Sequence, residues 1–248
     1  GGFVTDHRSP LAERWGGWYV TGTHGAARHM GNVFAQDRDH PDRLDRESGA
    51  NAASLKDRID TANYLAPSSD IVALMVLEHQ TRMLNLLTRV GWETRLALAD
   101  QQAINRALGE PADTLGDSTR RRIDNAVEEL VKYLLFAEEA PLESPIAGAA
   151  DFAAAFQSQG PRDRQGRSLR DLDMTTRMFR HPCSYLIYSE AFDSLPPAAL
   201  DRIYHRLHEI LTGADRSATY KRLTSADRKA VLEILLDTKR TLPAEWRN

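Results

Sequence analysis

Two histidines stand five residues apart near the start of the chain, in the run THGAARHMGN at residues 23–32. Neutral imidazole is a common ligand for metal ions and haem iron, and the glycines of this run let the backbone approach a bound group closely. His24 and His29 are therefore candidate metal or haem ligands. The alternative is that both rings hydrogen-bond the backbone of an ordered loop, and spacing alone leaves both interpretations open. His7 is a reserve candidate, because a turn explains its surroundings equally well.

A second pair lies in a segment with helical spacing. His79 and Met83 are four residues apart, so on a helix they share a face and point at one object. They are candidate ligands for a buried cofactor. A di-iron bundle would need a Glu-x-x-His motif, which is absent here because Glu78 adjoins His79. The alternative is a hydrogen-bonded core histidine beside a methionine that fills a gap.

Two tryptophans and one cysteine complete the chemically interesting residues. Trp15 and Trp18 have rings that can stack on a cofactor, although so large an apolar area more often anchors a loop to the core. Cys183 follows His181 at a predicted helix start, where a thiolate is stabilised. No orienting Asn or Asp is identified beside it, and solitary cysteines are mostly buried and inert. The chain has no phosphate-binding glycine loop and no GxSxG motif, which disfavours several familiar enzyme classes.

Helices are predicted to position most of these residues. From residue 69 onward, apolar residues recur three and four positions apart, as on amphipathic helices. The predicted helices cover residues 69–108, 118–137, 151–157, 168–179, 182–195, 197–211 and 226–238.

The first 68 residues lack such a period. The run WYVT at residues 18–21 between glycines favours a short hairpin, and one short helix is expected near residues 55–59. We therefore expect a mainly α fold, with an irregular helical domain at residues 69–248. A loop-rich, partly extended segment at residues 1–68 is expected to pack on it.

Composition limits the partners that the chain is expected to have. The 248 residues include 32 basic and 35 acidic side chains, for a net charge of −3, which gives no reason to expect nucleic acid as a partner. No apolar run approaches the roughly 20 residues that span a bilayer, so no membrane span is predicted. A single cysteine excludes an internal disulfide. Because the chain begins with Gly1 and no signal-peptide pattern follows, we expect a processed product or a fragment.

Several stretches make the chain resemble the carboxy-terminal part of an uncharacterised family of bacterial cytochrome c domain-containing proteins. The most specific of them is the tryptophan-glycine segment. The matching stretches are ERWGGWYVTGTHG at 13–25, RHMGN at 28–32, residues 70–83, 160–173 and 179–195, and LPAEWR at 242–247.

The resemblance implies a periplasmic or otherwise exported redox protein that carries haem c. In that family one CxxCH haem-attachment motif precedes the equivalent of Gly1, and this chain contains no CxxCH. A haem held upstream would leave this chain to supply the surrounding wall and the distal ligand. The resemblance thus implies His24, His29, His79 and Met83 as ligand candidates, and Trp15 and Trp18 as wall.

Three functions remain open from the sequence. The first is electron transfer with a redox partner protein, in which this chain is the helical body of the haem protein. The second is a haem-dependent, peroxidase-like enzyme, in which Arg28 and a distal histidine act at an open iron. The third is a non-catalytic helical interaction domain whose histidines are structural. The oligomeric state is left open.

Overall fold

The computed structural model describes residues 4–149 and 151–247, and its fold is mainly helical with very short strands. The α-helices are α1 (Ile71–Leu108), α2 (Asp117–Leu134), α3 (Phe152–Ser158), α4 (Glu190–Asp193), α5 (Pro197–Leu211) and α6 (Ser225–Thr238). The strands are β1 (Gly22–Thr23), β2 (Phe34–Ala35), β3 (Leu44–Asp45) and β4 (Ala147–Gly148). Short 3-10 helices occupy Leu11–Glu13, Tyr185–Tyr188, Ala218–Tyr220 and Ala244–Arg247.

The chain divides into two compact units that are not consecutive in sequence. Unit 1 comprises residues 1–80, 139–160 and 170–180, and unit 2 comprises 81–138, 161–169 and 181–248. The first ten residues of α1 belong to unit 1 and the rest of the helix belongs to unit 2. The predicted boundary at residue 68, between a loop-rich segment and a helical domain, stays a prediction.

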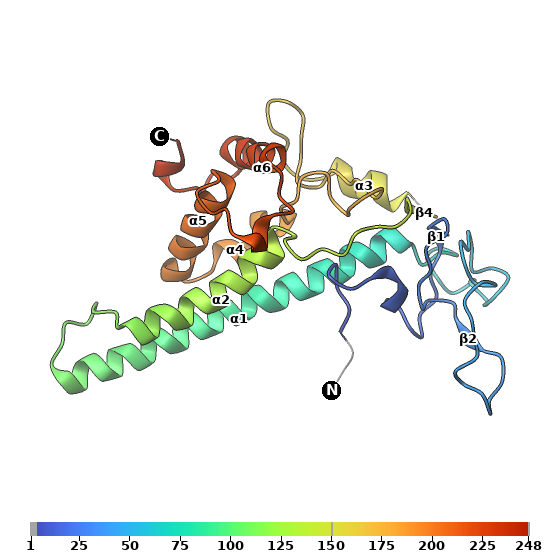
Figure 1. The fold of residues 1–248 in the computed structure, drawn as a ribbon, viewed down its shortest axis with the longest axis horizontal. Coiled ribbons are helices and arrows are strands. Elements are labelled where there is room, and N and C mark those ends of the chain that lie inside the picture. Colours follow the sequence, from blue (N-terminus) through green and yellow to red (C-terminus); the bar gives the residue numbers. More distant parts are fainter. Residues whose placement is uncertain (1–3, 150, 248) are drawn as a thin grey trace. The chain divides into compact units, whose positions relative to one another are not determined.

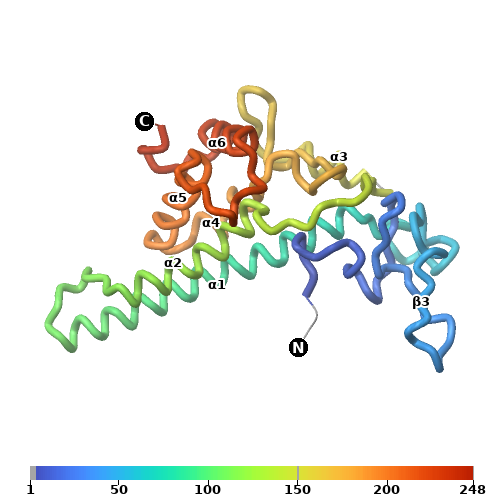
Figure 2. The backbone as a smooth tube through the Cα atoms, in the orientation of Figure 1, coloured from blue at the N-terminus to red at the C-terminus, as the bar shows by residue number. Residues whose placement is uncertain are grey.

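Unit 2 is built on a helical hairpin. After α1 the chain reverses and α2 runs back beside the last part of α1 (Figures 1 and 2). In α2 the buried positions Ile123, Val127, Leu130 and Leu134 are three or four residues apart. This confirms the amphipathic helix predicted there. Buried polar groups also join the two helices, because Thr119 Oγ1 donates to Gln101 Oε1 over 2.6 Å.

The other helices of unit 2 begin where their sequences predict. Pro197 occupies the first turn of α5, where a missing N–H costs nothing. Thr224 caps α6: its hydroxyl accepts from Asp227 N–H, and the Asp227 carboxylate accepts from Thr224 N–H, a reciprocal capping box. The expected helix over 182–195 is interrupted at Ser189, whose hydroxyl caps the start of the short α4.

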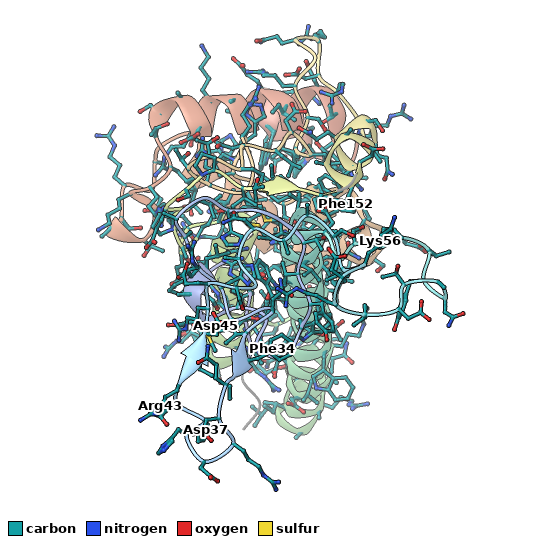
Figure 3. The ribbon with its side chains drawn as sticks, turned by 90° about the vertical axis from the view of Figure 1, so that its right-hand side faces the viewer. Phe34, Asp37, Arg43, Asp45, Lys56 and Phe152 are labelled. Carbon is teal, nitrogen blue, oxygen red and sulfur yellow. The ribbon has the colours of Figure 1, made fainter. Side chains whose placement is uncertain are left out.

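Unit 1 contains the loop-rich beginning of the chain. Its strands lie outside residues 18–21, where the sequence predicts a hairpin. β1 pairs antiparallel with the distant β4, so the hairpin expected around residues 18–21 is wrong. A local hairpin forms instead from β2 and β3. Figure 3 shows Phe34 and Asp45 on its strands, with Asp37 and Arg43 on the loop between them.

Two further predictions are wrong because local side-chain hydrogen bonds compete with helix formation. Residues 168–179 form a tight reversal rather than a helix, with Leu172 bridged to Phe179. The carboxylate of Asp173 accepts the N–H groups of Thr175 and Thr176, which stabilises the turn. Around residues 55–59 the chain makes a turn instead of the expected short helix.

The start of α1 fixes the amino-terminal segment within unit 1. Asp70 Oδ1 accepts the N–H groups of Val72 and Ala73 over 2.9 and 3.0 Å, so Asp70 rather than a preceding serine caps the helix. Thr21 pairs with Asp70 in an isolated bridge. The segment that holds the candidate histidines is therefore attached to a rigid helix end. Among the described residues, no helix is both long and apolar enough to cross a bilayer.

Candidate functional site

The turn that begins the site has an unusual backbone. Trp15 has a φ of +64°, a left-handed conformation that costs a non-glycine residue roughly 1–2 kcal/mol. Backbone hydrogen bonds hold this turn, because Arg14 O accepts from Met30 N–H and Trp15 O accepts from Trp18 N–H. Strained residues of this kind persist only where their surroundings fix them, and they cluster at functional sites.

Asn32 closes the segment from its other end. It too is left-handed, with a φ of +60°, and its side chain is buried. Its amide oxygen accepts from Val20 N–H over 2.8 Å, and its amide nitrogen donates to Val20 O and Gly49 O over 2.6 and 3.0 Å. A single side chain thus joins three stretches of backbone around the histidine run.

His24 is buried with both ring nitrogens engaged. Nδ1 donates to Ala27 O over 2.7 Å, and Nε2 accepts from the backbone N–H of Asn51 over 3.0 Å. Because a carbonyl only accepts and an amide N–H only donates, this network assigns the neutral Nδ1–H tautomer. Burial lowers the pKa of His24. No lone pair is left for a metal, so the backbone-bonding alternative applies to this residue.

His29 lies beside His24 and Trp15. Its ring centroid is 4.6 Å from that of His24 and 5.3 Å from that of Trp15, and both contacts are edge-on. Burial, and then the neighbouring His24, lower the pKa of His29 to about 4, so the ring is neutral at physiological pH. The Gly31 backbone opposes this shift and raises the pKa of His29, but no hydrogen bond of ordinary geometry to the buried Nδ1 is found among the described residues.

The second pair of histidines forms a separate contact in unit 1. His7 Nδ1 and His79 Nδ1 are 2.9 Å apart and the two rings stack, so one ring donates and the other accepts. Burial lowers the pKa of His79 to about 3, opposed by the charge of Asp6, and lowers that of His7 well below its ordinary value. His79 also meets Phe179 edge-on. His79 is thus a hydrogen-bonded core histidine, as the alternative interpretation has it.

Glu78, which the sequence interpretation set aside, occupies a polar environment of its own. Thr5 Oγ1 donates to Glu78 Oε1 over 2.7 Å, and Arg14 Nη1 lies 3.5 Å from Oε2. Burial raises the pKa of the Glu78 carboxyl, and the Thr5 hydrogen bond and the Arg14 charge oppose that shift. Arg14 is itself buried and donates twice to Ser9 O. Sequence spacing gave no signal for this cluster, because its members are far apart in the chain.

The remaining candidates are scattered. Trp18 is 56% exposed, so it does not anchor the loop to the core. Met83 is buried in unit 2, whereas the candidate histidines belong to unit 1. Burial raises the pKa of the Cys183 thiol, which favours an inert cysteine over a nucleophile. Arg28 pairs with Glu47 through two of its nitrogens.

The chemistry that this geometry permits is the donation of a neutral imidazole lone pair from His29. Within residues 4–149 and 151–247, no group of three or more His, Cys, Asp or Glu side chains is placed to hold a metal ion. No protein-family model, curated protein or solved structure matches the chain.

Proposed function

We propose that the segment from Trp15 to Asn32 is the cofactor-facing wall of a haem c protein that transfers electrons, with the haem attached upstream of Gly1. The observation that supports this proposal is the state of His29. Its imidazole is neutral, and among the described residues no hydrogen bond of ordinary geometry reaches its buried Nδ1, although the Gly31 backbone interacts with the ring and raises its pKa. An unpaired buried nitrogen is costly, and coordination would satisfy it. Export and a redox partner protein follow from the same family resemblance.

Among the candidate residues that the structure describes, His29 fits a haem ligand best. No hydrogen bond of ordinary geometry reaches its buried Nδ1, and its ring lies beside that of Trp15. His24 does not fit, because Ala27 and Asn51 use both of its nitrogens. His79 fits poorly, because its Nδ1 is bonded to His7. Haem would supply the electron-accepting centre, and Trp15 and His29 would exclude water from one side of it.

Two other functions were left open by the sequence. A peroxidase-like enzyme would use Arg28 at an open iron, but the pairing of Arg28 with Glu47 disfavours this role. A non-catalytic domain is favoured by the satisfied state of His24 and the pairing of His7 with His79. In that case His29 would contribute to stability alone.

The test is the visible spectrum of the product of the complete gene. We expect a Soret band and, with His29 as distal ligand, a six-coordinate low-spin haem. His29→Ala should convert the haem to a high-spin or water-ligated form. His205→Ala is the matched control, because that histidine is exposed on α5 and its removal should leave the spectrum unchanged. Absence of a Soret band would overturn the proposal and leave the non-catalytic domain as the better interpretation.

A further inference from the structure

We infer that Asn51 and His24 are positioning residues for His29: Asn51 fixes the His24 ring, and His24 in turn holds the His29 ring in place. The inference deepens the proposed function, since it concerns the same candidate ligand. The contacts that carry it are independent of any cofactor, so it can be tested on the chain alone.

Asn51 contacts the histidine run at three points across 27 residues of sequence. Its Oδ1 accepts from His24 N–H over 2.6 Å, its backbone N–H donates to His24 Nε2 over 3.0 Å, and its Nδ2 donates to Gly25 O over 3.1 Å. It adopts a φ of +53°, which asparagine tolerates better than most residues. One asparagine therefore fixes both the backbone and the ring of His24.

A fixed His24 ring determines the surroundings of His29. A half-turn of the ring would put Cδ2 and Cε1 where Nδ1 and Nε2 now lie, so the hydrogen bonds with Ala27 O and Asn51 N–H would both be lost. The His24 ring meets the His29 ring edge-on at 4.6 Å, and Trp15 makes a second edge-on contact with His29 at 5.3 Å. With these two rings fixed, His29 has little freedom to turn. Ligating histidines are usually oriented by such supporting contacts.

Nuclear magnetic resonance of ¹⁵N-labelled imidazoles in the purified chain tests the inference. In the wild type, His24 should show the Nδ1–H tautomer, and His29 should stay neutral down to about pH 5, given its pKa of about 4. Asn51→Ala removes both side-chain hydrogen bonds and places alanine at a left-handed position. We expect His24 to lose its single tautomer, and the titration midpoint of His29 to rise by about one pH unit or more toward the ordinary 6.5.

Two further variants separate positioning from general destabilisation. Asn51→Gly tolerates the φ and keeps the backbone donor to Nε2, so it should retain the His24 tautomer and shift His29 less than alanine does. Asn105→Ala removes a buried amide in unit 2, where it donates to Pro111 O and Thr114 O. That control should lower stability without moving the His29 midpoint. An unchanged His24 tautomer in Asn51→Ala, or a His29 shift no larger than in Asn105→Ala, would overturn the inference.

The outcome is distinguishable from that of the proposed function. A correct His24 tautomer and a shifted His29 midpoint, with no Soret band from the complete gene, would support positioning and reject haem. A low-spin haem in the product of the complete gene, with a His29 midpoint that is the same in the purified Asn51→Ala and wild-type chains, would reject positioning and leave haem ligation standing.

Discussion

At the scale of single residues, asparagines in left-handed conformations organise the amino-terminal segment. Asn32 and Asn51 have φ values of +60° and +53°, and each returns hydrogen bonds from its side chain to distant backbone. A short amide both tolerates this conformation and supplies a donor and an acceptor together. The backbone around His24 and His29 is thereby held without regular secondary structure.

Asn32 gives a direct test of this role. Asn32→Ala should lower the free energy of unfolding by about 3 kcal/mol, since it removes three buried hydrogen bonds worth about 1 kcal/mol each or less and strains the backbone. Asn32→Gly removes the same hydrogen bonds but accepts the positive φ, so it should cost roughly 1 kcal/mol less. Urea unfolding measures both. Equal losses for the two variants would show that the backbone conformation contributes nothing.

At the scale of elements, the sequence predicted the helices that local periodicity controls and missed features that local side-chain hydrogen bonds or distant contacts control. The stripes of α2 and α5 are amphipathic, and both helices lie where the apolar spacing put them. Residues 168–179 carry enough apolar residues to suggest a helix, but the carboxylate of Asp173 stabilises a turn there. The pairing of β1 was not predicted, because its partner β4 is far away in sequence.

The same distinction applies to the candidate site. The histidine spacing drew attention to residues 23–32, yet it could not separate His24 from His29. The difference is made by Asn51, which lies 27 residues away and takes up one nitrogen of His24. Glu78 was set aside on its position next to His79, and only the fold brings Thr5 and Arg14 to it.

The capping box of α6 provides a prediction at this scale. Thr224→Ala removes the acceptor for Asp227 N–H and should destabilise the chain by about 1 kcal/mol. The matched control is Ser225→Ala, since Ser225 lies one position later and is exposed; it should change stability by less than about 0.5 kcal/mol. Thermal or urea unfolding distinguishes them. If both variants lose the same amount, the reciprocal capping bonds are not the source of stability.

At the scale of the whole molecule, buried neutral histidines couple folding to pH. His29 and His79 have pKa values of about 4 and about 3 in the fold, against about 6.5 in an unfolded chain. Between these limits the unfolded state binds more protons than the folded state, so stability falls as pH falls. This loss of stability begins below pH 6.5. Carboxylates such as Asp215, with a pKa of about 2, reduce stability only at a much lower pH. The raised pKa of Glu78 acts in the opposite direction and reduces the slope.

The contribution of His79 can be isolated because this histidine is fully buried. The free energy of unfolding of the wild type, measured in urea at intervals from pH 7 to pH 4.5, should fall with decreasing pH. Each histidine that titrates only in the unfolded state contributes up to about 1.4 kcal/mol per pH unit. His79→Gln keeps a polar side chain opposite His7 but cannot bind the proton, so the slope should decrease by about that amount, although stability at pH 7 also falls. His205→Ala, which removes an exposed histidine, should leave the slope unchanged. A wild-type slope retained in His79→Gln would mean that His79 is already charged in the fold, contrary to its burial against His7 and Phe179.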